Sequence, residues 1–163
     1  MYKNADKYPH ELFVQNAVIK WLRANHWSKK MIVTDGRGPD IFVTNDNYSR
    51  TWTIECKGGS YSAKYPDACD SVNFRLALGQ VLMRKGGTSR TKLEAKEGGN
   101  KLGVAFPNTP GFMKHLGSFN WQFAKALNLY LFFVDKDGAV EIYDWKRLKN
   151  EVRNNDSGRS VLG

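Results

Sequence analysis

The chain has 163 residues, of which 41% are hydrophobic and 13% aromatic, so it is long enough and apolar enough for one packed domain. Its longest unbroken apolar run, Leu129 to Val134, has six residues, whereas a membrane-spanning helix needs about 20. The polar start, Met1 to His10, carries no apolar segment of the signal-peptide type. The two cysteines, Cys56 and Cys69, are too few for a disulfide framework. We therefore expect one soluble domain in the cytoplasm, without membrane association.

The charge balance points to a polyanionic partner. Lys and Arg together number 25 against 16 Asp and Glu, which gives a net charge of +9. A basic surface favours nucleic acid because each neutralised phosphate also releases condensed counterions. The alternative is that the excess charge serves solubility alone.

The first half of the chain reads as a helix followed by three strands. Apolar residues recur at three- and four-residue spacings over residues 10–24, directly after Pro9, which predicts an amphipathic helix. Short β-like runs follow at 31–34, 41–44 and 51–57, separated by a turn at 35–38 and a hairpin loop at 45–50.

The second half alternates helices and strands. The pattern predicts a helix over 72–85, a mobile basic loop over 86–101, a strand at 102–106, a helix over 111–127, strands at 129–135 and 140–143, and a basic tail that frays. Hairpins require antiparallel strand pairs, whereas a helical crossover permits a parallel pair. We therefore expect an α/β sandwich with a central mixed sheet flanked by helices.

One pair of short segments carries the chemistry. Gly38-Pro39-Asp40-Ile41 begins the second strand, and Ile54-Glu55-Cys56-Lys57 ends the third, with Glu55 fifteen residues after Asp40. Side chains alternate along a strand, so we expect Glu55 and Lys57 on one face and Cys56 on the other. Pairing of the two strands would bring Asp40 beside Glu55.

Two adjacent carboxylates repel each other unless a cation lies between them, and oxygen ligands suit Mg²⁺. Such an ion lowers the pKa of a bound water and so helps to generate a nucleophile. Lys57 could orient that water or stabilise negative charge on an attacked phosphate. The acidic pair, the metal and the ammonium are the parts that phosphodiester hydrolysis needs.

These segments resemble the signature of the PD-(D/E)XK nucleases, the restriction-endonuclease-like superfamily, and the similarity extends over about residues 9–143. The resemblance implies an αβββαβ core and a Mg²⁺ cofactor, with Mn²⁺ able to substitute. It implies that Asp40, Glu55 and the Cys56 carbonyl bind metal and that Lys57 is catalytic. It also matches Glu11 to an acidic residue near the metal and Gln80 to a glutamine on the helix after the lysine strand.

Several cations lie near the motif in the sequence and could position phosphates without reading bases. With Gln80, the candidate DNA-binding residues are Arg37, Arg75, Arg84, Lys85, Arg90 and Lys92. The alternative for each cation is an ordinary solvated basic face.

The motif residues also have structural alternatives. Asp40 could cap a turn, and Glu55 with Lys57 could be a solvent-facing ion pair on an edge strand. Glu11 could complement the helix dipole, Gln80 could be structural, and Trp52 could belong either to the core or to the cleft.

The sequence therefore predicts one nuclease domain over residues 1–163 that acts as a Mg²⁺-dependent DNA endonuclease. Such a domain could act alone, as a homodimer, or as the cleavage subunit of a restriction, transposition or repair complex with a partner protein. The alternative function is a non-catalytic nucleic-acid-binding module that retains the nuclease fold.

Overall fold

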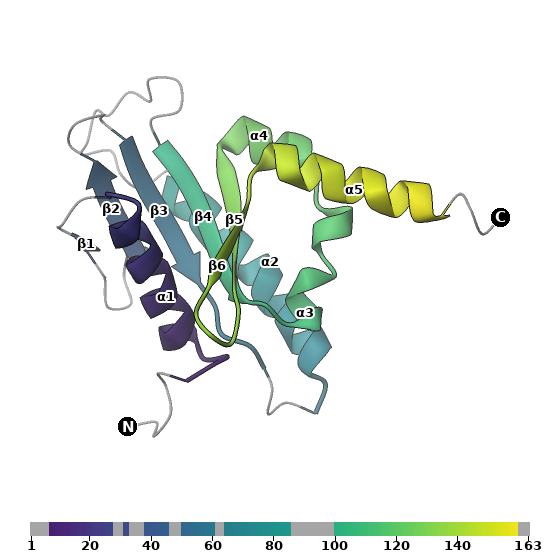
Figure 1. The fold of residues 1–163 in the computed structure, drawn as a ribbon, viewed down its shortest axis with the longest axis horizontal. Coiled ribbons are helices and arrows are strands. Elements are labelled where there is room, and N and C mark those ends of the chain that lie inside the picture. Colours follow the sequence, from purple (N-terminus) through teal and green to yellow (C-terminus); the bar gives the residue numbers. More distant parts are fainter. Residues whose placement is uncertain are drawn as a thin grey trace.

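One mixed β-sheet organises the part of the chain that the structure describes (Figure 1). The structure is a computed structural model, and it describes residues 7–27, 31–32, 38–45, 50–60, 64–85 and 100–159. Six strands lie in the sheet in the same order as in the chain. They are β1 (Met31–Ile32), β2 (Ile41–Asn45), β3 (Arg50–Cys56), β4 (Asn100–Pro107), β5 (Leu129–Val134) and β6 (Val140–Tyr143).

The strand directions follow from the connections. Strands β1, β2 and β3 pair antiparallel, as expected for short hairpin connections. Strand β3 pairs parallel with β4, and β4 pairs parallel with β5. The crossover from β3 to β4 includes α2 (Pro66–Lys85), while β6 returns antiparallel to β5. The predicted α/β architecture with a mixed sheet and flanking helices is confirmed.

Helix α1 (Glu11–Ala24) covers one face of the sheet. Its buried residues are Val14, Ala17, Val18 and Leu22, at the three- and four-residue spacings that place them on one side of a helix. They pack against inward-facing residues of β2 to β5, including Ile41, Ile54, Cys56, Ala105 and Phe132. The helix predicted for residues 10–24 is confirmed.

The opposite face is covered by α2, α3 (Pro110–Met113), the 3₁₀ helix η1 (Leu116–Ser118), α4 (Trp121–Leu127) and α5 (Trp145–Arg159). Buried side chains of α2 meet alternate residues of β4 and β5 there, among them Phe74, Ala77, Leu102, Val104 and Leu131. The sheet is therefore buried between two helical layers, with α1 alone on one side (Figure 1). Among the described residues, every helix is too short or too polar to cross a bilayer.

The single helix predicted over residues 111–127 is wrong. Helix α3 ends at Met113, η1 follows, and α4 begins anew after Asn120. The Asn120 side chain accepts hydrogen bonds from the N–H groups of Gln122 and Phe123, at 3.0 and 3.1 Å. This N-cap starts a separate helix. Helix α2 also begins earlier than the predicted residue 72, at Pro66, a residue favoured at a first helical position.

The frayed tail predicted after Tyr143 is also wrong over residues 145–159, which form α5. Leu148 is fully buried in the core beside the partly buried Trp145. Their spacing of three residues is helical, and apolar burial stabilises the helix against fraying. Of the predicted mobile loop, Asn100 and Lys101 belong to β4, whereas residues 86–99 lie outside the described part of the chain.

Candidate active site

The pairing of β2 with β3 brings Asp40 and Glu55 together. Ile41 lies opposite Ile54, so Asp40 and Glu55 occupy the next positions along the two strands. The Asp40 Oδ2 atom accepts a hydrogen bond of 2.6 Å from the Cys56 backbone N–H. The predicted proximity of the two acidic residues is therefore confirmed. This hydrogen bond joins Asp40 to the neighbouring strand β3, so the Asp40 side chain does more than cap a turn.

Glu55 is buried in the middle of the sheet. Strand β3 lies between β2 and β4, and Glu55 is only 1% exposed. The alternative of a solvent-facing ion pair on an edge strand is therefore wrong. A carboxylate in such a place loses most of its hydration, which makes its charge costly unless cations or hydrogen bonds offset the loss.

The other face of β3 belongs to the core. Trp52, Ile54 and Cys56 alternate with Glu55 and pack in the apolar cluster under α1. Trp52 is 2% exposed, and its ring meets Phe132 edge-on with the ring centroids 5.3 Å apart. Trp52 is therefore a core residue and does not line a cleft. The predicted burial of the Cys56 side chain is confirmed.

Lys57 follows the last residue of β3 and meets the first turn of α1. Its Nζ atom lies 3.6 Å from Glu11 Oε2, and its side chain is 17% exposed, whereas that of Glu11 is 50% exposed. The Lys57 N–H donates to the Ala105 carbonyl of β4 at 2.9 Å. Lys57 is thus fixed through its backbone by β4 and through its ammonium group by Glu11.

Electrostatics joins these side chains into one group. Partial burial raises the pKa of the Glu11 carboxyl, the Lys57 charge lowers it, and the Asp40 charge raises it. Burial raises the pKa of the Cys56 thiol well above its usual value, and the negative charges of Asp40, Glu11 and Glu55 raise it further. Three carboxylates and one ammonium therefore act on the same thiol. We call Glu11, Asp40, Glu55 and Lys57 the carboxylate–lysine cluster.

Two contacts that the sequence analysis missed attach α1 to this cluster. Gln15 Nε2 donates to the Asp40 carbonyl at 2.9 Å, one helical turn after Glu11. A Cβ atom on Gly58 would lie 2.6 Å from the Glu11 backbone nitrogen, so glycine is required for this close approach. The four-residue spacing of Glu11 and Gln15 places them on one helix face and could have suggested a shared role.

A third missed residue, Asp70 of α2, fixes the segment that follows Lys57. Asp70 is 3% exposed. One carboxylate oxygen accepts from the Ser60 N–H, and the other accepts from the Thr109 hydroxyl, both at 2.8 Å. The carboxylate therefore ties the chain beyond β3 to the chain beyond β4. Nothing in the spacing of Asp70 from the motif predicts this role.

The remaining candidates lie apart from the cluster or outside the described residues. Gln80 is on the exposed side of α2, and within the described ranges no hydrogen bond or ion pair joins it to the cluster. Arg75 is exposed on the same helix. The pKa of the His115 imidazole is lowered mainly by burial, and the charges of Lys114 and Arg75 lower it further. The structure describes only the backbone of Arg84 and Lys85, and Arg37, Arg90 and Lys92 fall outside the described part.

The donor set of the cluster suits a hard cation. Among the described residues, no three His, Cys, Asp or Glu side chains are grouped closely enough to hold a metal ion. Mg²⁺ needs fewer protein ligands than that, because it is commonly bound through one or two carboxylates and keeps several waters or phosphate oxygens as its other ligands. Asp40 and Glu55 are the two carboxylates of the cluster that could take this part. An oxygen that accepts from a backbone N–H retains lone pairs for a cation.

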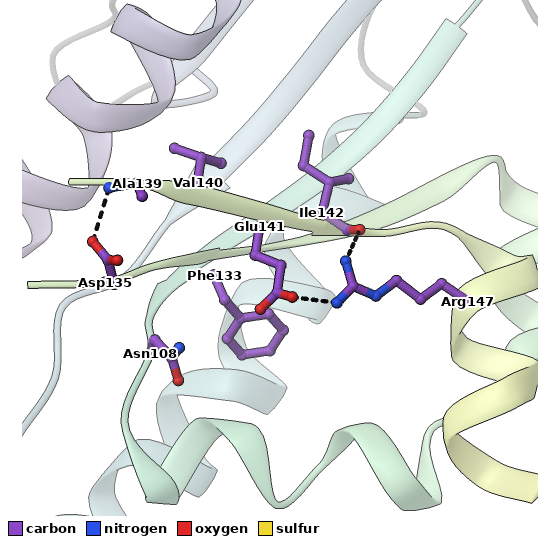
Figure 2. A pocket seen from close by; sticks show the side chains of 8 residues that line it. All are labelled: Asn108, Phe133, Asp135, Ala139, Val140, Glu141, Ile142 and Arg147. Carbon is purple, nitrogen blue, oxygen red and sulfur yellow. Dashed lines mark hydrogen bonds and ion pairs between the residues drawn. The ribbon is translucent and has the colours of Figure 1, made fainter. Parts of the chain in front are cut away.

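A pocket of about 400 Å³ lies elsewhere, beside the β5–β6 hairpin and the start of α5 (Figure 2). Its charged side chains are engaged with the protein itself. Arg147 pairs with Glu141 and donates to the Ile142 carbonyl at 3.2 Å, and Asp135 accepts from the Ala139 N–H at 2.8 Å. The pocket contains no member of the carboxylate–lysine cluster, so we do not assign the chemistry to it.

Comparison with known proteins gives no match for this chain among protein-family models, curated proteins or solved structures. A function for the chain is therefore inferred from its own residues and their geometry.

Proposed function

We propose that the protein is a Mg²⁺-dependent DNA endonuclease with a restriction-endonuclease-like fold and a PD-ExK active site formed by Asp40, Glu55 and Lys57. One observation carries the proposal. The Asp40 carboxylate accepts a hydrogen bond from the backbone of Cys56, the residue of β3 that lies between the buried Glu55 and Lys57. Two carboxylates and an ammonium at the end of one strand pair are the groups that metal-assisted phosphodiester hydrolysis uses.

The charge of the cluster supports a bound cation. Glu11, Asp40 and Glu55 contribute three carboxylates against the single ammonium of Lys57, in a chain whose net charge is +9. Asp40 and Glu55 would hold Mg²⁺, with the Cys56 carbonyl as a further ligand and Glu11 in contact with a water of the ion. When bound, Mg²⁺ would polarise the phosphate and lower the pKa of a water.

The protein's own groups would orient the substrate and stabilise the transition state. Lys57 would donate a hydrogen bond to the phosphate as negative charge accumulates on its oxygens. Glu11 would hold the Lys57 ammonium at the end of β3, at the 3.6 Å separation described above. Gln15, through the Asp40 carbonyl, would fix the position of the second strand relative to α1.

The proposal is tested by plasmid nicking with purified protein in Mg²⁺, in Mn²⁺ and in EDTA. We expect cleavage with either metal and none in EDTA. Asp40→Asn and Glu55→Gln should lose cleavage by more than about 100-fold, with DNA affinity within about tenfold, because the basic surface is unchanged. Asp137→Asn, which changes an exposed carboxylate outside the cluster, is the matched control and should cleave normally.

Lys57→Ala should reduce turnover by about 10²–10³ with little change in the Mg²⁺ requirement, because it removes a stabilising donor and no metal ligand. Cleavage by Asp40→Asn at the wild-type rate would refute the site. A wild-type protein that binds linear, nicked, branched and single-stranded DNA but cuts none of them would instead support a non-catalytic binding module. Cleavage that appears only after addition of a partner protein would identify a subunit of a larger complex.

A further inference from the structure

The surface of α4 and α5 carries a group of cations supported by two tryptophans. Lys146, Lys149 and Arg153 follow one another on α5 at spacings of three and four residues, so they lie along one face of that helix. Lys125 of α4 joins them, because its Nζ atom lies 4.8 Å from the centre of the Trp145 ring. We call this surface the α4–α5 patch; its members are Lys125, Lys146, Lys149, Arg153, Trp121 and Trp145.

The tryptophans hold the lysine amines in place. The Trp121 and Trp145 rings lie with their centroids 6.3 Å apart, and both pack against the core. The Nζ atoms of Lys149 and Lys146 lie 4.9 and 5.7 Å from the centres of the Trp121 and Trp145 rings. Cation–π contacts at these distances favour an ammonium over the ring face and restrict its motion. The patch therefore presents ordered positive charge.

Among the residues of α5 whose side chains the structure describes, the acidic residue Glu151 lies on another side of the helix. Glu151 lies one turn after Arg147, and the charges of Glu141 and Glu151 act on the Arg147 guanidinium. Within the described residues, none of the lysines Lys125, Lys146 and Lys149 forms an ion pair with a carboxylate. The amines are thus available to an anionic partner.

The patch lies far from the carboxylate–lysine cluster. Helix α4 leads into the start of β5, and α5 follows the end of β6, whereas Lys57 follows the opposite end of the parallel strands. Figure 1 shows α4 and the first turn of α1 at opposite ends of the sheet. The eight residues of β4 between these ends correspond to about 26 Å at roughly 3.3 Å per residue, or about eight base pairs of duplex DNA.

We propose that the α4–α5 patch binds the phosphate backbone of duplex DNA about eight base pairs away from the cleaved bond. The proposal rests on the proposed function in taking DNA as the partner. Phosphates are favoured over bases because lysine amines lie over the tryptophan faces on which bases would stack. From Lys146 to Arg153 the helix extends about 10 Å, a length that corresponds to about three phosphates along one strand. The contact would be independent of sequence.

The test measures binding of the full chain to a 30-base-pair duplex of about three turns, in EDTA, by fluorescence anisotropy across a salt series. Each phosphate contact contributes about 0.9 to the slope of log K against log salt. The double variant Lys146→Gln with Lys149→Gln should therefore lower that slope by about two and weaken binding at low salt. The matched control is Lys20→Gln with Arg23→Gln, which removes two exposed cations at the same three-residue spacing from α1 and should leave the slope unchanged.

The outcomes separate this proposal from the nuclease proposal, because binding in EDTA requires no cleavage. An unchanged slope in the α5 variant, with a normal melting temperature, would overturn the patch even if the wild-type protein cuts DNA. A reduced slope would support the patch even if no cleavage is found. The same α5 variant is also tested for binding to single-stranded DNA and to vesicles of anionic lipid. If it binds either of these more weakly than the wild type does but binds duplex DNA normally, the proposal is overturned.

Discussion

Replacing Gly58 with alanine should move the first turn of α1 away from the end of β3. The new Cβ atom would lie 2.6 Å from the Glu11 nitrogen and 3.1 Å from the His10 carbonyl carbon, whereas ordinary contact begins at 3.4 Å. Both atoms belong to the backbone, so no flexible side chain can turn aside. The 3.6 Å ion pair between Glu11 and Lys57 spans the same junction and should lengthen.

Forcing one extra carbon into a packed site costs about 1–3 kcal/mol. In a protein of this size, each kcal/mol lowers the melting temperature by about 2–4 °C, so we expect a fall of about 2–12 °C for Gly58→Ala. Gly79→Ala is the matched control, because it adds the same carbon where, apart from its chain neighbours and the adjoining backbone of α2, no atom lies within 4 Å. In the interior of α2 this change should raise stability by about 0.5–1 kcal/mol.

The measurements are thermal unfolding and urea unfolding of the wild type and the two alanine variants, each monitored by circular dichroism. Opposite signs for Gly58→Ala and Gly79→Ala are the expected result. Equal stability of Gly58→Ala and the wild type would mean that α1 does not approach β3 as described, and the positions of Glu11 and Gln15 in the site would then be wrong.

Two further variants test the surroundings of the site. Asp70→Asn should cost about 1–3 kcal/mol in urea unfolding, because the amide oxygen of asparagine can replace only one of the two carboxylate oxygens that accept from the partly buried Ser60 N–H and Thr109 hydroxyl; full stability would contradict the role given to Asp70. Burial, and to a smaller extent neighbouring positive charge, lowers the pKa of the His115 imidazole below its usual 6.5. As the pH falls through 6.5, the unfolded state therefore binds a proton at His115 before the folded state does. Stability should therefore be lost as the pH falls from 7.5 to 5.5, and the loss should be smaller in His115→Gln; equal losses in both proteins would show that another group titrates.

The arrangement of strands was predictable because it follows from local patterns. Alternating and apolar runs indicate the strands, and the short loop between β2 and β3 leaves little choice but an antiparallel hairpin. That register alone places Asp40 next to Glu55. The cluster of these two residues with Lys57 could thus be predicted from a few residues of sequence.

The missed features depend on contacts between distant segments. Whether Gln15 reaches the Asp40 carbonyl depends on how α1 is rotated on the sheet, which apolar spacing fixes only to within a broad face. Asp70 receives hydrogen bonds from two loops that lie 10 and 39 residues away in the chain. The break before α4 did have a local signal, since Asn120 is a strong N-cap residue inside an otherwise helical apolar pattern.

The packing of α1 has a consequence for synthesis on the ribosome. Helix α1 leaves the ribosome first among the described elements, yet its apolar face packs partly against Phe132 and Val134 of β5. At about 5–20 residues per second, roughly 6–24 s separate the synthesis of Val14 from that of Val134. Helix α1 provides Glu11 to the cluster and the Gln15 contact to Asp40, so the cluster is completed only after β5 has been made. A nascent chain halted before β5 would carry Asp40, Glu55 and Lys57 without a completed support for them, and should therefore lack the proposed cleavage activity.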